Sequence, residues 1–269
     1  MKQTETKLPK VIHRCLSAVV LSLIILMVMP NGANADEADA KRILKAMSDY
    51  MGNQQSLSFE FDAILEVVTK DEQKLGLASS GAVTLNRPDK IRVARTGGFT
   101  DIELIFDGKT LTLLGKNVNR YTQFELPGSI DHLFDELKIT YHRPLPASDL
   151  LLSEAYDELM RDVVDIKDLG SGVIGGVQCD HLAFRTNEVD WQIWIARGER
   201  PYPYRFVITS KLVDGGPQYA IQTRNWKTEG AVAAANFQFK NTTKAEKVDL
   251  KDIKGADDLP DHFVKGDAK

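Results

Sequence analysis

The stretch Cys179-Asp180-His181 places a thiol, a carboxylate and an imidazole side by side. Cysteine nucleophiles and some metal sites use these groups. The surrounding residues, GVQCDHLAFR, read as a β-strand, in which residues i and i+2 share a face. Cys179 and His181 therefore point to one side of the strand and Asp180 to the other. Two strand rises separate the α-carbons of Cys179 and His181 by about 6.6 Å, too far for good contact between sulfur and imidazole. We predict ordinary strand packing, with thiol-dependent chemistry at these two residues as the alternative.

Other chemical motifs do not favour catalysis. The histidines that follow the N-terminal region show no H-x-x-x-H or C-x-x-C spacing: His132, His142, His181 and His262. No G-x-S-x-G or phosphate-loop motif occurs. The glycine-rich run GSGVIGG from Gly170 precedes a strand and not a helix, so its glycines are predicted to mark a bend or bulge. We predict no metal, no cofactor and no enzymatic activity.

The N-terminus predicts export. Basic residues precede an apolar run from Leu16 to Met29, and small residues around Ala33 and Ala35 follow it. This pattern is typical of a secretory signal peptide, which we place at residues 1–35 with cleavage after Ala35. The alternative is an uncleaved membrane anchor. Cleavage would remove Cys15 and leave Cys179 as the only thiol, which excludes an intrachain disulfide.

The charge pattern limits the class of partner. The chain of 269 residues has a formal net charge of −4. It lacks the basic stripe that nucleic-acid binding requires, so we predict no nucleic-acid partner. Beyond the signal peptide, no apolar segment is long enough to span a bilayer, and a periplasmic location is predicted.

The periodicity of the chain predicts a mainly β protein with some helix. Residues 38–53 have helical spacing, and residues 56–68 switch to period two, with Leu57 to Val67 alternating on one face. Period-two runs and short turns such as Asp107-Gly108 then predict roughly nine to eleven antiparallel strands. Strands are expected at 172–185, 190–196, 204–213, 218–228 and 235–239 in the second half.

A helical insertion at about residues 129–165 is expected between the two halves of the sheet. Segments 129–137 and 148–165 both show apolar residues at helical spacing, and each begins with a serine as cap candidate. We predict one domain over residues 36–243, followed by a charged and flexible tail at 244–269.

A curved antiparallel sheet of this kind forms an incomplete barrel, and helices with apolar stripes would cover it as a lid. A hollow between them would hold a hydrophobic ligand if its lining is apolar. Periodicity does not distinguish such a hollow from a filled core. The alternative is therefore a cell-envelope scaffold with a filled core and a protein partner.

The order of the elements resembles that of the periplasmic lipoprotein carriers of the LolA and LolB type. The block IGGVQCDHLAFRTNEVDWQIWIARGERPYPYRFVIT, followed by PQYAIQTRNWK, resembles an uncharacterised family of predicted periplasmic proteins, domain of unknown function 2092.

This resemblance implies a non-catalytic carrier or binding protein for a lipid, an acylated protein or another hydrophobic ligand. An envelope protein is the other partner it implies, and transient contact with a membrane is compatible with it. The implied ligand-binding residues line the long strands and the lid: Phe59, Phe61, Leu65, Leu104, Phe106, Leu113, Leu133, Leu152 and Trp191.

Overall fold

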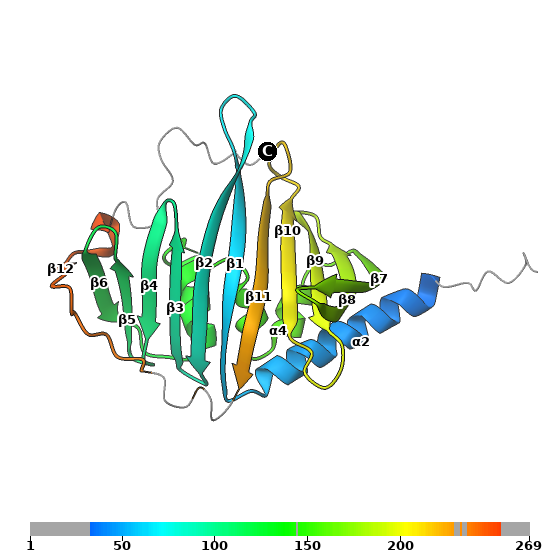
Figure 1. The fold of residues 1–269 in the computed structure, drawn as a ribbon, viewed down its shortest axis with the longest axis horizontal. Coiled ribbons are helices and arrows are strands. Elements are labelled where there is room, and N and C mark those ends of the chain that lie inside the picture. Colours follow the sequence, from blue (N-terminus) through cyan, green and yellow to red (C-terminus); the bar gives the residue numbers. More distant parts are fainter. Residues whose placement is uncertain (1–32, 144, 229–231, 233–235, 254–269) are drawn as a thin grey trace, which may run out of the picture. The chain divides into compact units, whose positions relative to one another are not determined.

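The computed structural model describes residues 33–143, 145–228, 232 and 236–253. The chain divides into two compact units, residues 1–36 and 37–269, and the fold below is that of the second unit. Most of the predicted signal peptide lies outside the described residues. Figure 1 shows the described elements.

The second unit is built on one sheet of twelve strands in the order β12-β6-β5-β4-β3-β2-β1-β11-β10-β9-β8-β7. All neighbours are antiparallel except the short β12–β6 pair, which is parallel. The strands are β1 (Ser56–Val68), β2 (Lys74–Asn86), β3 (Lys90–Gly97), β4 (Thr100–Phe106), β5 (Thr110–Gly115), β6 (Arg120–Glu125), β7 (Asp165–Ile174), β8 (Val177–Arg185), β9 (Val189–Ala196), β10 (Pro203–Ser210), β11 (Gln218–Thr228) and β12 (Glu246–Lys247). The order leaves β12 and β7 as the two edges of an open sheet.

The inner face of the sheet packs against the helices. The residues of β1 show how the sequence determines which side chains lie on this face. Leu57, Phe59, Phe61 and Ala63 are buried, while Glu60 and Asp62 between them are exposed on the outer face. This alternation follows the period of two predicted for residues 56–68. The predicted fold class, mainly β with an antiparallel sheet and a helical cover, is confirmed.

Two helices cover the inner face near their predicted positions, and the first begins at Ala33, ahead of the predicted start at residue 38. In α2 (Ala33–Gly52), Leu44, Met47 and Met51 are fully buried. Helix α3 (Ile130–Ile139) begins at the predicted cap, because the Ser129 hydroxyl accepts a hydrogen bond from the His132 N–H. These helices and the inner face share one continuous apolar core.

The predicted helix at 148–165 is wrong in its extent. The structure has a 3₁₀ turn, η1 (Ser148–Leu151), and a short helix, α4 (Ala155–Met160), and β7 already begins at Asp165. Ala147 in the left-handed region and Leu152 in the extended region bound η1. Ser148 is not the cap. The apolar residues of this segment are buried by two separate short elements, η1 and α4. Their spacing fits one longer helix equally well, which explains the wrong prediction.

The predicted strand at 172–185 is a hairpin of β7 and β8. Gly175 and Gly176, with φ of 57° and 84°, form its two-residue turn, a conformation that favours glycine. Gly170, with φ of 82°, lies where the pairing register shifts between Asp168 and Ser171, which confirms the predicted bulge.

The C-terminal segment also differs from its prediction. Residues 236–239 of the strand predicted at 235–239 contain no regular element, although Phe239 packs on Tyr121 with ring centroids 4.8 Å apart. Residues 244–253 of the predicted tail include β12 and a 3₁₀ turn, η3 (Leu250–Asp252), and Ile253 is buried. Regular elements therefore continue beyond residue 243, and residues 254–269 lie outside the described residues.

Candidate functional site

A cavity of about 120 Å³ lies between the inner face and residues 145–152, which we name the roof segment. Its walls come from six adjacent strands: Ile102 of β4, Ile91, Val93 and Arg95 of β3, Val83 of β2, Phe59 and Phe61 of β1, Tyr219, Ile221, Thr223 and Trp226 of β11, and Pro203 of β10. Pro146, Ala147, Leu150 and Leu151 line it from the roof segment. The lining is mainly apolar, so burial of an apolar group there is favourable.

An aromatic stack forms one wall of the cavity. The Trp226 ring stacks on Phe59, with centroids 4.2 Å apart, and on Tyr202, with centroids 4.8 Å apart and planes 5° apart. The indole N–H of Trp226 donates to Thr223 Oγ1 at 3.0 Å, and this hydroxyl donates to the Pro203 carbonyl at 2.6 Å. These bonds fix the orientation of the indole.

Sequence reasoning missed Trp226 because its position breaks the strand period. Thr223 faces the inner side, and strict alternation would direct Trp226 outward. The register between β1 and β11 shifts at this point, and Asn225 has φ of 55°. This bulge turns Trp226 inward onto Phe59. An asparagine before the tryptophan is the signal that could have indicated it.

Polar contacts hold the end of the roof segment. Arg87 Nη2 donates to the Leu151 carbonyl at 2.8 Å, and Arg87 Nε is buried without a hydrogen-bond partner among the described residues. Burial lowers the pKa of the Arg87 guanidinium, and the Asp131 carboxylate partly offsets this. Asp131 in turn accepts from the Ser153 N–H at 3.3 Å.

Two further cavities adjoin the roof segment. One of about 140 Å³ is lined by Phe134, Leu152 and Asp149 among others. Another of about 310 Å³ is lined by Asp149, Trp191 and Phe206 among others. Asp149 borders both, and burial raises the pKa of its carboxyl. Residues 145–148 line both the 120 Å³ and the 140 Å³ cavities, and Asp149 is the residue of the roof segment that reaches the 310 Å³ cavity.

The nine predicted ligand-binding residues fall into three groups. Phe59 and Phe61 line the 120 Å³ cavity. Six belong to the core or pack against it: Leu104, Phe106, Leu113, Leu133, Leu152 and Trp191. Leu65 lies nearer the β1–β2 turn and is 37% exposed. Their role in binding stays a prediction.

The Cys179-Asp180-His181 stretch makes three unrelated sets of contacts. Cys179 is fully buried, its Sγ donates to the Val177 carbonyl at 3.5 Å, and burial raises the pKa of its thiol. The His181 ring stacks on Trp194, with centroids 4.0 Å apart, and its Nε2 lies 2.9 Å from Gln192 Oε1. Asp180 pairs with Arg197 at 2.6 Å. A buried thiol with a raised pKa is a poor nucleophile.

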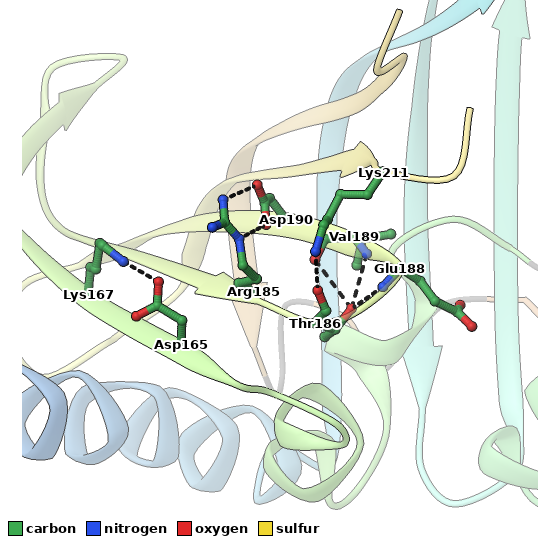
Figure 2. A network of polar contacts seen from close by, with 8 residues as sticks. All are labelled: Asp165, Lys167, Arg185, Thr186, Glu188, Val189, Asp190 and Lys211. Atoms are coloured by element: carbon green, nitrogen blue, oxygen red, sulfur yellow. Dashed lines mark hydrogen bonds and ion pairs between the residues drawn. The ribbon is translucent and has the colours of Figure 1, made fainter. Parts of the chain in front are cut away.

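Polar contacts join the end of β8, the start of β9 and Lys211, which follows β10, and a separate Asp165–Lys167 pair lies within β7 (Figure 2). Arg185 makes two hydrogen bonds to Asp190, at 2.7 and 2.8 Å, which lower the pKa of the Asp190 carboxyl. Lys211 Nζ donates to the Thr186 carbonyl at 2.8 Å. The Thr186 hydroxyl accepts from the backbone N–H groups of the β8–β9 turn. These contacts are those of a hairpin cap, and they contribute to the local structure.

Two kinds of feature are absent from the described part of the chain. No three His, Cys, Asp or Glu side chains there converge as metal ligands. None of the helices described combines the length and the apolarity that crossing a bilayer requires.

The sequence of residues 40–251 matches the family model described as "Predicted periplasmic protein (DUF2092)". The chain belongs to this family. No curated protein sequence matches this DUF2092 member.

Several solved structures are similar to this DUF2092 member at low identity. An uncharacterized conserved protein from Thermus thermophilus has a TM-score of 0.44 and 11% identity, over 78% of this chain and 99% of that chain. The Mycobacterium tuberculosis lipoprotein LppX has a TM-score of 0.38 and 12% identity, over 75% of this chain and 100% of that chain. A LolA superfamily protein from Nitrosomonas europaea has a TM-score of 0.33 and 13% identity, over 71% of this chain and 93% of that chain.

Proposed function

We propose that this periplasmic protein binds or carries a lipid, an acylated protein or another hydrophobic ligand, without catalysis. The observation that supports the proposal is the apolar cavity on the inner face, which the roof segment lines on one side, with two more cavities beside that segment. An acyl chain would be stabilised there by about 0.8 kcal/mol for each buried methylene.

The size of the cavity requires the roof segment to move. A space of about 120 Å³ suits a short apolar group, whereas ligand pockets usually measure about 300 to 1,000 Å³. Displacement of residues 145–152 would join the cavity to the neighbouring spaces of about 140 and 310 Å³. The joined space would fall in the range that accommodates a long chain.

The roof segment has features of a displaceable element. Its regular structure is one four-residue 3₁₀ turn. Ala147, the residue directly before this turn, has φ of 65°. A non-glycine residue in the left-handed region destabilises the backbone by on the order of 1 kcal/mol. Short elements with few internal hydrogen bonds open more easily than core strands.

The second candidate function is a cell-envelope scaffold that binds a protein partner through its surface. The observation that favours it is the density of the core, since Leu104, Phe106, Leu133 and Trp191 are all almost fully buried. In that case the cavity is a packing defect of the kind found in many interiors.

The deciding experiment compares two phenylalanine variants of one strand. Val93 lines the cavity, and Thr96 is exposed on the outer face of the same strand. We expect Val93→Phe to fill the cavity and weaken binding of a fluorescent fatty acid at least about tenfold, and Thr96→Phe to leave it unchanged. Mass spectrometry of a solvent extract of the unmodified protein should also show a co-purified lipid. Empty protein that does not bind fatty-acid probes would favour the scaffold.

A further inference from the structure

We propose that the hydrophobic ligand carries a carbonyl group, as in an ester or an amide linkage, and that the Tyr219 phenol donates a hydrogen bond to the carbonyl oxygen. This inference rests on the proposed function and names the chemical class of the ligand. Three observations on the inner face support it.

The first observation is the place of Tyr219 in the sheet. Tyr219, Ile221 and Thr223 follow one another at a spacing of two residues in β11, so they share one face. All three line the cavity, which places Tyr219 on the inner face. Tyr219 pairs with Leu65 of β1 on one side and with Ile208 of β10 on the other. Its backbone is therefore fixed by two neighbouring strands.

The second observation is that the Tyr219 hydroxyl forms no hydrogen bond to any residue that the structure describes. Burial raises the pKa of the phenol to about 12, the positive charge of Arg95 partly opposes this rise, and no hydrogen bond contributes to it. The hydroxyl oxygen is not one of the fully enclosed atoms that lack a partner, so part of its surface faces open space. Because Tyr219 lines the cavity, its phenol is a protonated donor available to a ligand at neutral pH.

The other hydroxyl groups of the lining are less suited to this role. Thr223 Oγ1 already donates to the Pro203 carbonyl and accepts from the Trp226 indole. Ser148 belongs to the roof segment, which the proposed function requires to move. Tyr219 is therefore the hydroxyl donor that a rigid strand holds in place, and rigid elements position binding groups most precisely.

A carbonyl oxygen is the acceptor that fits this donor in an apolar lining. A ligand hydroxyl would bring an O–H donor that needs an acceptor of its own, whereas a carbonyl group only accepts hydrogen bonds. A carboxylate would carry a negative charge into the cavity, and removing water from a charge is costly. An uncharged carbonyl avoids both costs.

The third observation is a gradient of burial that orients the ligand. Leu65, in the same row as Tyr219, is 37% exposed, whereas Leu57 at the other end of β1 is fully buried. Ile91, which lines the cavity, is also fully buried. The carbonyl group would thus lie toward the upper end of β1 in Figure 1, and the chain would extend toward Ile91. This orientation leaves the rest of the ligand, beyond its ester or amide, on the open side.

The test compares two probes with one carbon skeleton: undecyl methyl ketone and its methylidene analogue, in which a CH₂ group replaces the carbonyl oxygen. Their dissociation constants are measured by displacement of the fluorescent fatty acid from the full-length protein and from its Tyr219→Phe variant. We expect Tyr219→Phe to weaken binding of the ketone about fivefold and to leave that of the analogue within about twofold, the size expected for one hydrogen bond. Comparing the two proteins for each probe cancels the difference in hydration between the free probes.

Two further probes identify the linkage, because methyl dodecanoate is an ester and N-methyldodecanamide is an amide. The larger loss of affinity in Tyr219→Phe assigns either the ester of a lipid or the amide of an acylated protein. The matched control is Tyr121→Phe. Tyr121 packs on Phe239 and does not line the cavity, so its variant should change none of the dissociation constants.

Infrared spectroscopy gives a second measurement, made on the unmodified protein. A hydrogen bond weakens the C=O bond, so the band of an isotope-labelled ketone carbonyl should lie at lower frequency in the complex than in hexane. In Tyr219→Phe the band should return toward its position in hexane. A purely structural role of Tyr219 would not shift this band.

The outcomes separate this inference from the proposed function. If Tyr219→Phe weakens binding of the ketone and the analogue equally, or weakens neither, the carbonyl inference is overturned and the cavity function stands. A carbonyl band that keeps its hexane position in the unmodified protein overturns the inference as well. If none of the probes binds, both are overturned. Retained binding of the analogue shows that Tyr219→Phe is folded.

Discussion

Arg87 connects the sheet to the roof segment through a single charged hydrogen bond. Its Nη2 donates to the carbonyl of Leu151, the last residue of η1, and burial lowers the pKa of its guanidinium. Removing water from a half-buried guanidinium costs free energy. The hydrogen bond to the Leu151 carbonyl explains why Arg87 lies in this position.

We expect Arg87→Met to lower the free energy of unfolding by about 1 to 2 kcal/mol, because the Leu151 carbonyl loses its donor. Urea unfolding measures this. The matched variant is Arg185→Met, which removes an exposed ion pair with Asp190 and should cost at most about 1 kcal/mol. Equal losses in the two variants would show that the bond to Leu151 contributes no more than a surface pair.

Residue types alone were a poor guide to chemistry in this chain. Cys179 and His181 share a strand face, as the sequence predicted, yet each contacts a different group: the Val177 carbonyl and the Trp194 ring. Conversely, Trp226, which lines the cavity, appears in the sequence as an outward-facing residue of an ordinary strand. Only the bulge at Asn225 turns it inward.

At the scale of elements, η1 is the part of the cover with the least regular structure, and it contains an ionisable group. Burial raises the pKa of Asp149, with a further rise from Glu158 and opposing effects of Lys138 and Arg161. An acid whose folded pKa is raised is protonated more readily in the folded state than in the unfolded state. Its carboxylate therefore costs stability above its folded pKa and costs none below its unfolded pKa.

We expect Asp149→Asn to increase the free energy of unfolding at neutral pH and to have little effect near about pH 3, where the acid is protonated in both states. The stability of the unmodified protein should correspondingly fall relative to the variant as the pH rises through the folded pKa. Chemical denaturation of both proteins across this range is the measurement. A constant difference at all pH values would mean that the carboxylate is solvated and that η1 is already open.

The success of element prediction depended on how each element is stabilised. Strand β1 has a regular alternation of buried and exposed residues, and helix α3 has a serine cap. The predicted positions of both agree with the structure. The η1–α4 region failed because its leucines are buried from two short turns, and a spacing of three or four residues fits those turns as well as it fits one helix.

At the scale of the whole molecule, a ligand that binds only the folded state must stabilise the entire domain. A concentration of about one hundred times the dissociation constant adds about 2.7 kcal/mol to the free energy of unfolding. We expect thermal unfolding of the full-length protein to shift upward with a fatty acid, and the shift to vanish in Val93→Phe. If the fatty acid instead acted as a detergent on the protein surface, the thermal shift would be equal in Thr96→Phe and Val93→Phe.

The sequence by itself determined the membership in a family of predicted periplasmic proteins, the antiparallel strand class, the inner face of β1 and the cap of α3. These features depend on local periodicity and on side-chain to backbone bonds, which adjacent residues specify. The tertiary structure decided the inward turn of Trp226 at a bulge and the space beneath the roof segment. Strand register and the distance between helix and sheet arise from contacts between residues far apart in the chain, and a period of two contains no information on either.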